Sequence, residues 1–127
     1  MMNDGLQQFT KQSYLNLETF RKNGEGVRTP VWFWEDGGVL YVRTIDGSGK
    51  VKRARRNPQV RVAPCKVDGT PLGTWVSAEA RFVDEAEAER VNRGLKKKYG
   101  LMKTLFDLMG SRKSRPTTLA IQVRAGE

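Results

Sequence analysis

Short segments of alternating apolar and polar residues recur along the chain, and turn-forming residues separate them. The segments span residues 14–20, 27–35, 39–44, 59–67, 72–83 and 117–125. Because successive side chains of a strand point to opposite faces, this alternation is typical of half-buried β-strands. Asn-Gly at 23–24 and Asp-Gly-Gly at 36–38 supply tight turns between neighbouring segments, which favours antiparallel hairpins. We therefore predict an antiparallel sheet whose first three strands are nearly contiguous.

Three further segments have helical patterns. Residues 84–99 begin with a capping-box-like Asp and Glu pair and then repeat apolar residues at helical spacing. A short basic helix is expected over residues 50–57, before a proline, and an amphipathic helix over residues 101–110. Strands and helices do not alternate regularly, which argues against a parallel dinucleotide-binding fold. Many short strands with few helices indicate a mainly β protein, a β-barrel or strongly curled sheet with accessory helices.

The length and charge of the chain limit its organisation and its ligands. It has 127 residues, and we interpret residues 1–127 as a single domain. Only 38% of them are hydrophobic, so burial of further surface against a second copy is expected. The formal net charge of +9 attracts anions such as nucleic acids, acidic lipids and phosphorylated small molecules. The sequence has no membrane-spanning run and no signal-peptide layout, which predicts a soluble, cytoplasmic protein.

The residue types also exclude several kinds of chemistry. The chain has no histidine and one cysteine, Cys65. Histidine-dependent triads and cysteine-ligated zinc are therefore ruled out, and no transition-metal site is expected. No pair of carboxylates suited to general acid and base catalysis is evident in the sequence, and no nucleophile has a visible base. Either a bound cofactor carries most of the chemistry, or the protein has none.

The motif GSGK at residues 47–50 is a candidate anion site. Its glycines let backbone N–H groups approach an anion, its serine offers a hydroxyl, and the following helix presents a positive N-terminus. Lys50 is unfavourable in the first helical turn unless an anion compensates it. Arg53 shares the helix face of Lys50, whereas Lys52 and Arg55 are expected to face solvent. The motif is short, so an anion site and a plain solvated loop both remain open.

The stretch TPVWFW at residues 29–34 has two interpretations. Pro30 lacks an N–H, so within a sheet it belongs at an edge or a bulge. The three consecutive aromatic residues point to alternate faces of a strand. They either fill the barrel and a dimer seam, or they present an exposed aromatic edge that flanks a planar ring system. Trp75, isolated in the long strand predicted over residues 72–83, permits the same two interpretations.

Two stretches of the chain together carry a family resemblance. LETFRKNGEGVRTPVWFWEDGGVLYVRT and then GSGKVKRARRNPQVRVAP resemble the split-barrel flavin-binding superfamily typified by pyridoxamine 5'-phosphate oxidase. Within that superfamily the chain is most similar to a branch of small F-420-dependent (deazaflavin) enzymes. The resemblance extends from the first predicted strand to the last. It implies a homodimeric split β-barrel that binds two cofactors, F-420 or FMN, in grooves at the subunit interface.

The resemblance also implies which residues form the cofactor site. The backbone of Thr29, Pro30, Val31 and Trp32 would run along the ring system of the cofactor. The phosphate-binding positions match Thr44, Ser48, Gly49 and Lys50, and further negative charge could be met by Arg53, Arg43 and Arg56. A weaker match concerns Trp75 and Ser77, on a strand that could approach the partner's cofactor.

The chain departs from pyridoxamine 5'-phosphate oxidases in two respects. Phe33 stands where those enzymes carry a basic residue, and their substrate-recognising C-terminal segment has no counterpart here. We therefore do not expect vitamin B6 oxidation. The dense positive charge of the predicted helix at 50–57 suits the phosphate and polyglutamate tail of F-420, which modestly favours that cofactor over FMN.

These observations predict a cofactor-dependent oxidoreductase in which F-420 or FMN exchanges hydride with a small organic substrate. One alternative is an FMN-binding pyridoxamine phosphate oxidase-like protein, and another is a flavin carrier without turnover. A nucleic-acid-binding barrel whose aromatic residues stack bases is a more remote alternative. No catalytic side chain and no metal ligand is nominated, and no membrane partner is expected.

Overall fold

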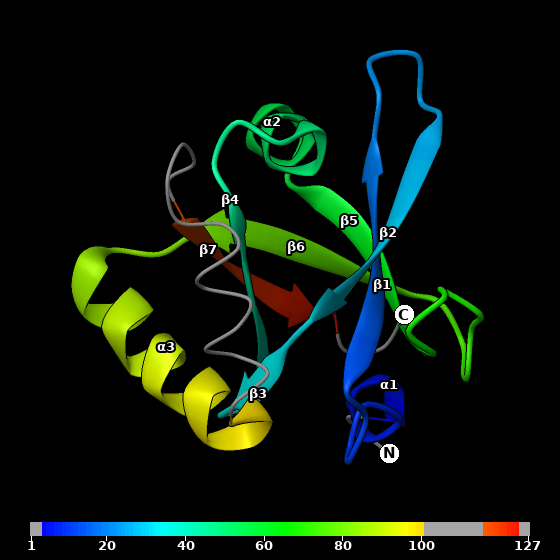
Figure 1. Ribbon diagram of the computed structural model, residues 1–127. Helices are drawn as coiled ribbons and strands as arrows, with labels where there is room; N and C mark the ends of the chain where they lie inside the picture. The colour runs from blue at the N-terminus through cyan, green and yellow to red at the C-terminus, as the bar shows by residue number, and fades with distance from the viewer. Residues whose placement is uncertain (1–3, 101–115, 125–127) are drawn as a thin grey trace.

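A computed structural model describes residues 4–100 and 116–124, which form one antiparallel sheet of seven strands with three helices (Figure 1). The strands are β1 (Tyr14–Phe20), β2 (Gly26–Trp32), β3 (Trp34–Asp36), β4 (Val39–Ile45), β5 (Gln59–Cys65), β6 (Val76–Phe82) and β7 (Pro116–Val123). The helices are α1 (Asp4–Gln7), α2 (Gly49–Arg56) and α3 (Glu85–Tyr99). The predicted mainly β fold with accessory helices is confirmed.

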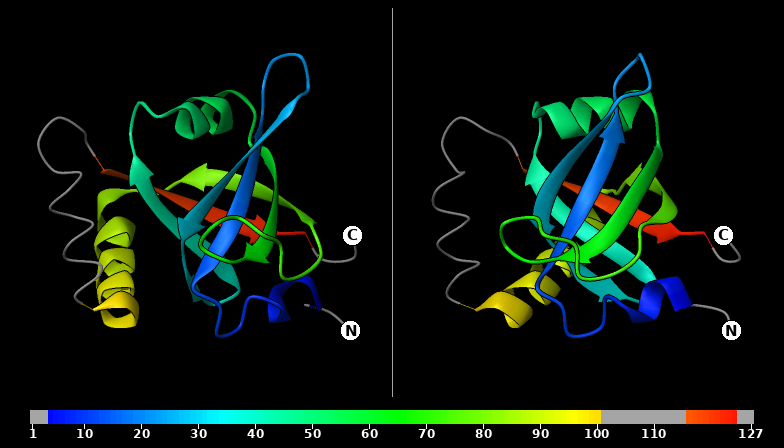
Figure 2. Two further views of the ribbon diagram at one scale, coloured as in Figure 1. Left: turned by 45° about the vertical axis from the view of Figure 1, so that its right-hand side comes forward. Right: turned by 90° about the vertical axis from the view of Figure 1, so that its right-hand side faces the viewer.

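The connection between β2 and β3 explains why the sheet curls. The strands follow the order β2-β1-β5-β6-β7-β4-β3, so β2 and β3 lie at opposite edges of the sheet. Only Phe33 separates these two strands in the chain. The two edges must therefore approach one another, which produces a barrel split beside β2 (Figures 1 and 2). Helix α2 and the tip of the β1–β2 hairpin lie at one end of this barrel, and α1 and β3 lie at the other.

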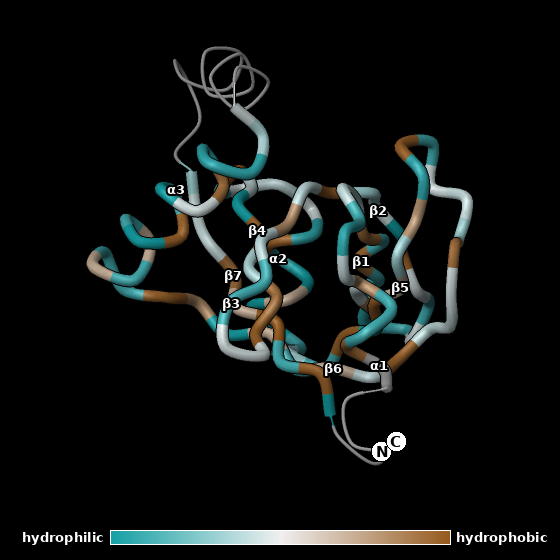
Figure 3. The backbone as a smooth tube through the Cα atoms, turned by 90° about the horizontal axis from the view of Figure 1, so that it is seen from below, coloured by the Kyte–Doolittle hydropathy of each residue, from teal (hydrophilic) through white to brown (hydrophobic). Residues whose placement is uncertain are grey.

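The barrel interior is filled by the apolar members of the alternating strands, which appear as brown stretches between teal ones in Figure 3. Leu15 and Leu17 of β1 and Val60 and Val62 of β5 are buried there. Other strand residues in the same cluster are Leu40, Val42, Ala78, Ala80, Leu119 and Ile121. Ala54 of α2 also joins it, so the short basic helix closes one end of the barrel with a thin apolar edge.

Helix α3 covers the outer face of β4 and β7 and forms a second apolar cluster there. Val91 and Leu95 pack with Tyr41 and Ala120. The helix begins as predicted, because the Asp84 side chain accepts a hydrogen bond from the N–H of Glu87 at 2.9 Å. None of the helices in the described parts of the chain is long and apolar enough to cross a membrane.

Three expectations about the strands were wrong in detail. The strand predicted over residues 27–35 is interrupted at Phe33, where the chain crosses from one sheet edge to the other. The first hairpin is confirmed, but β4 pairs with β3 and β7 instead of continuing beside β2. The strand predicted over residues 72–83 begins only at Val76, and Leu72 is exposed. The predicted helix over 101–110 lies outside the described residues.

The loop before β6 explains the late start of that strand. Residues 66–75 fold back over β1, where the Asn16 side-chain amide donates to the carbonyl of Gly69 at 2.7 Å. Gly69 has a φ of 93°, a backbone conformation that glycine adopts far more readily than other residues. The loop thereby covers part of the outer face of β1. The four-residue helix α1 was not predicted.

Candidate functional site

The N-terminus of α2 carries an unsatisfied polar group. Ser48 is the N-cap residue, but its side chain makes no capping hydrogen bond. Its hydroxyl oxygen is buried and has no hydrogen-bond partner among the residues that the structure describes. The cost of burying a hydroxyl is recovered only when it forms a hydrogen bond. The hydroxyl and the free N–H groups of the first turn of α2 therefore form a set of donors suited to an anion.

Two cations near this helix end lack compensating acids. Burial lowers the pKa of Lys50, and the neighbouring Arg53 charge lowers it further. Within the described chain no hydrogen bond or ion pair engages Lys50. Burial also lowers the pKa of Arg53, as do the charges of Arg21 and Arg56. Asp46, in the preceding turn, instead lies 3.7 Å from Arg55. An anion bound beside Lys50 and Arg53 would thus relieve an unfavourable accumulation of positive charge.

Arg53 lies against the glycine of the motif. The nearest Arg53 nitrogen would lie 2.8 Å from a Cβ atom at position 49, so the absence of a side chain at Gly49 makes room for the guanidinium. The Arg53 Nε donates to the Thr19 hydroxyl of β1 at 2.7 Å, which fixes the orientation of the side chain. The structure thus brings Ser48, Gly49, Lys50 and Arg53 together in one region, which we call the α2 cradle.

The remaining predicted phosphate-site residues are distributed around this cradle. Thr44 is buried on β4, opposite Thr117. Arg56 is exposed and donates to the carbonyl of Phe20 at 3.2 Å, so it ties α2 to the end of β1. Arg43 lies on the other side of β4, where it lines a separate cavity of about 410 Å³ with Asn92 of α3. The fold therefore does not bring Arg43 to the α2 cradle within one protomer.

The predicted ring-binding segment lies on an edge strand. Thr29, Pro30, Val31 and Trp32 belong to β2, which pairs with β1 on one side and ends the order of the sheet on the other. Proline is tolerated in an edge strand because its missing N–H costs no ladder hydrogen bond there. No described strand pairs with the outer edge of β2, so backbone groups that point outward there are placed to hydrogen-bond the rim of a planar heteroaromatic ring.

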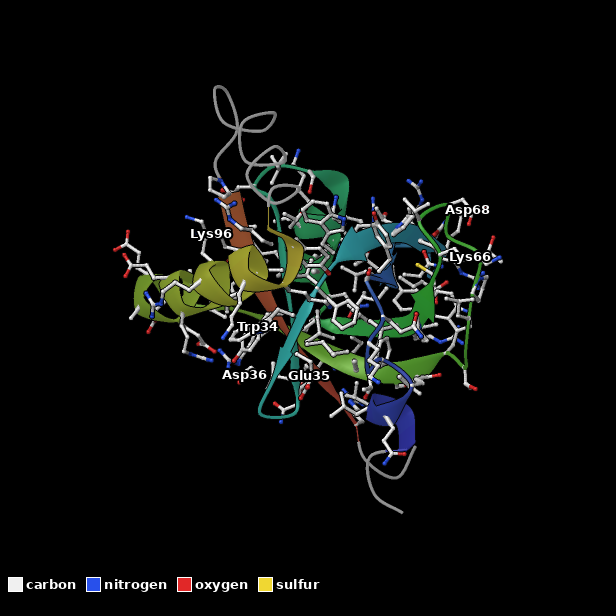
Figure 4. The ribbon with its side chains drawn as sticks, turned by 60° about the horizontal axis from the view of Figure 1, so that its bottom comes forward. Trp34, Glu35, Asp36, Lys66, Asp68 and Lys96 are labelled. Carbon is white, nitrogen blue, oxygen red and sulfur yellow. The ribbon has the colours of Figure 1, made fainter. Side chains whose placement is uncertain are left out.

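The aromatic residues of TPVWFW pack within the protomer. Phe33 is buried in the barrel and meets Phe9 edge to face, with the ring centroids 5.8 Å apart. The rings of Trp32 and Tyr99 are stacked at 4.5 Å between centroids. Trp34 packs against α3 at Gly94, and Figure 4 labels it on β3. Of the three aromatic residues only Phe33 fills the barrel, whereas Trp32 and Trp34 are partly exposed and pack against α3; the expected dimer seam stays a prediction.

The last turn of α3 fixes the backbone at Phe33, where β2 and its predicted ring-binding segment end. The Tyr99 hydroxyl accepts a hydrogen bond from the Phe33 N–H at 3.1 Å and donates to the Ser13 carbonyl at 2.6 Å. Burial raises the pKa of Tyr99 to about 12, so the hydroxyl stays protonated and able to donate. Tyr99 thereby positions the end of β2, a role that helical spacing alone does not reveal.

Trp75 belongs to a different face of the molecule. It precedes β6, and the guanidinium groups of Arg28 and Arg61 lie 4.6 and 5.3 Å from its ring centroid. Ser77 stands opposite Arg61 in the strand register. Glu18 accepts hydrogen bonds from both arginines. This cluster was not predicted from the sequence, where its one signal is charged residues at neighbouring strand positions.

Comparison with known proteins identifies the fold. No protein-family model and no curated protein matches the chain. The heme storage protein HutZ of Vibrio cholerae has a TM-score of 0.73 and 16% identity, over 95% of this chain and 88% of that one. A predicted pyridoxamine 5'-phosphate oxidase of Listeria innocua has a TM-score of 0.65 and 18% identity, over 95% and 94%. An FAD-binding protein of Mesorhizobium loti has a TM-score of 0.65 and 15% identity, over 95% and 88%. The chain therefore has the fold that these proteins share, a split β-barrel.

Proposed function

We propose that this protein is an oxidoreductase that binds a phosphorylated flavin-type cofactor and exchanges hydride between it and a small organic substrate. The observation that carries the proposal is the buried, unpartnered Ser48 hydroxyl in the α2 cradle, beside the uncompensated cations Lys50 and Arg53. A phosphate group would accept hydrogen bonds from these donors and offset their charge. The donor set of the cradle thus fits the phosphate of such a cofactor.

The bound cofactor would supply the hydride chemistry, and the protein would supply position and environment. The α2 cradle anchors the phosphate end. The outer edge of β2, in the segment from Thr29 to Trp32, orients the ring by backbone hydrogen bonds, and Tyr99 holds the end of that strand in place. Fixed orientation of two reactants lowers the entropic part of the barrier. We assign no side chain of the described site as a general acid or base.

Between the two cofactors, the charge near the cradle favours F-420 over FMN. Lys52 and Arg56 are exposed on α2, and Arg21 and Lys22 are exposed on the neighbouring β1–β2 hairpin. The two elements lie side by side at one end of the barrel (Figures 1 and 2). A polyglutamate tail that leaves the cradle would meet this positive surface. FMN lacks such a tail and would use the cradle alone.

We also propose that a second copy of the chain completes the groove. The outer edge of β2 has no partner strand within the sheet of the described residues. A ring bound only along this edge would keep one side open to water. A second protomer would exclude that water and strengthen the polar contacts around the reacting atoms.

Titration of the purified protein with F-420 and with FMN, followed by cofactor fluorescence, tests the proposed function. We expect micromolar binding of at least one cofactor. Lys50→Ala should weaken it about tenfold or more, because a hydrogen bond to a charged group contributes about 1.5–3 kcal/mol. Lys97→Ala removes the same charge from an exposed position on α3 and should change the affinity less than about twofold at 0.15 M salt, where fields are screened.

Three results would contradict parts of this proposal. Equal effects of the two lysine substitutions would show that the overall positive field attracts the cofactor and that the α2 cradle is not a phosphate site. Absence of cofactor binding, together with tight and steeply salt-dependent binding of single-stranded DNA, would favour the nucleic-acid alternative. Cofactor binding without oxidation of the reduced cofactor by any of a panel of organic acceptors would favour a carrier.

A further inference from the structure

A second cavity, of about 410 Å³, lies at the end of the barrel opposite the α2 cradle. Its walls come from α1 and the turn after it, from Phe33 and the start of β3, and from Lys98 of α3. Figure 4 looks toward this end of the molecule and labels Trp34 and Glu35 on β3. The volume is in the usual range for small-molecule sites, so the cavity can accommodate an organic ligand.

The Lys98 side chain has an unusual environment in this cavity. Its ammonium donates to the carbonyl of Phe33 at 2.8 Å and lies 3.7 Å from the centroid of the Phe33 ring. No carboxylate in the described parts of the chain forms an ion pair with it. An ammonium has three N–H donors, and the Phe33 carbonyl uses one of them. Two charged donors are thus left for a ligand.

The remainder of the cavity combines an aromatic surface with a positive rim. Phe9 and Phe33 form an edge-to-face pair beside the cavity, but they are only 2% and 1% exposed. The apolar surface open to a ligand comes from Leu6 and Trp34, which line the cavity and are half-buried. Lys11 also lines it and has a φ of 67°, which a residue other than glycine rarely adopts. Glu35 is the acid on the wall, and its carboxylate accepts a hydrogen bond from the N–H of Gly38 at 3.0 Å in the β3–β4 turn.

We propose that this cavity binds a small aromatic or apolar monocarboxylate, with its carboxylate on Lys98 and its apolar body against Leu6 and Trp34. The ligand would supply the negative charge that the Lys98 ammonium lacks, while Leu6 and Trp34 would shield one side of the ion pair from water. This site is separate from the α2 cradle, and the inference does not depend on the proposed cofactor chemistry.

Binding of 2-naphthoate, measured by its fluorescence, tests the site, with the neutral 2-naphthalenemethanol as the matched ligand without charge. We expect 2-naphthoate to bind the full chain at least tenfold more tightly than the alcohol. Lys98→Gln should abolish this preference, whereas Lys97→Gln, which removes a charge from the adjacent residue outside the cavity lining, should preserve it. Lys50→Ala should leave naphthoate binding unchanged and thereby distinguish this cavity from the cradle.

The pH dependence gives a second signature. Burial lowers the pKa of Lys98 to about 8, while the charge of Glu35 opposes the shift. Lys98 is therefore fully protonated at about pH 6, and it loses the positive charge that binds the carboxylate as the pH rises through this pKa. Naphthoate affinity should fall between about pH 7 and 9 in the wild-type protein and stay flat in Lys98→Gln. Glu35, Lys11 and Tyr99 are the other ionisable groups near the site, and they are unchanged in that comparison.

Three results would overturn the proposal. The first is equal affinity of Lys98→Gln and Lys97→Gln for naphthoate. The second is equal affinity of the wild-type protein for the acid and the alcohol, and failure to bind either one measurably counts as this result. Lys98→Arg keeps the positive charge and is the control that distinguishes loss of charge from a folding defect in Lys98→Gln. It should retain the preference for the acid, and loss of the preference in a folded Lys98→Arg protein would also count against the proposal.

Discussion

Glu18 is a charged residue that the fold buries between neighbouring strands. It lies on the outer face of β1 and is only 5% exposed. In the strand register it stands opposite Arg28 of β2 and Arg61 of β5, and its oxygens lie 3.1 and 3.2 Å from their nitrogens. Gly26 leaves the space that the carboxylate occupies, because a Cβ atom there would overlap it. One buried acid thus links three neighbouring strands.

Substitution Glu18→Gln should lower the free energy of unfolding by about 1–3 kcal/mol. The amide keeps the shape but removes the charge-assisted hydrogen bonds and leaves two arginines close together over Trp75. Denaturant unfolding followed by tryptophan fluorescence measures the change. Glu25→Gln is the matched control, because Glu25 forms an exposed pair with Arg21 at 3.2 Å and should contribute less than about 1 kcal/mol. An equal loss in both variants would contradict the structural role given to Glu18.

The residues that could be predicted from the sequence were those with local signals. The motif around Ser48 and Lys50 combines glycines, a hydroxyl and cations within four positions, and the structure brings these residues together with Arg53. Glu18 and Lys98 have no such signal, because their environments depend on strands or turns that are distant in the chain. Only the register of the sheet and the docking of α3 reveal them.

Helix α3 is attached to the sheet through a close contact and a polar network. Gly94 lies flush against the indole of Trp34, with no room for a side chain between them. On the same side, the Tyr41 hydroxyl donates to Glu87 at 2.8 Å, and Arg81 contacts the same carboxylate at 3.0 Å. Burial raises the pKa of Tyr41, and the hydrogen bond to Glu87 raises it further. The helix position therefore depends on both packing and polar contacts.

Gly94→Ala should have opposite effects on stability in two backgrounds. In an otherwise wild-type chain the added methyl overlaps Trp34, so the free energy of unfolding should fall by about 1–3 kcal/mol. In a Trp34→Ala background the overlap is gone, and the higher helix propensity of alanine should instead stabilise the protein by up to about 1 kcal/mol. Thermal and denaturant unfolding of the four proteins measure both effects. The same sign in both backgrounds would contradict the contact.

The elements of the barrel were predicted more reliably than their arrangement. Alternation identified the strands, and the Asp84 cap identified α3, because these patterns reflect local backbone periodicity. The interruption at Phe33 was missed, since Phe33 continues the apolar pattern of β2 and its backbone is held by Tyr99, 66 residues away. The strand order likewise depends on contacts between distant segments.

At the scale of the whole molecule, the net charge of +9 attracts anions from every side. The affinity that comes from the α2 cradle must therefore be distinguished from the affinity that comes from this overall field. A general positive field would attract any phosphorylated ligand, and salt would screen it strongly, since the Debye length falls from about 10 Å at 0.1 M to about 3 Å at 1 M. Hydrogen bonds from a partly buried cradle are screened much less. The two contributions can therefore be separated by salt.

Riboflavin and FMN form the matched pair for this measurement, because they differ only by the phosphate. Raising NaCl from about 0.1 to about 1 M should weaken FMN binding several-fold and leave riboflavin binding nearly unchanged. A local phosphate site requires that FMN still binds about tenfold more tightly than riboflavin at about 1 M salt, which corresponds to about 1.4 kcal/mol. F-420, whose tail adds carboxylates outside the cradle, should lose more affinity with salt than FMN does. Convergence of FMN and riboflavin at high salt would instead show that the field of the whole molecule attracts the phosphate and that the α2 cradle does not bind it.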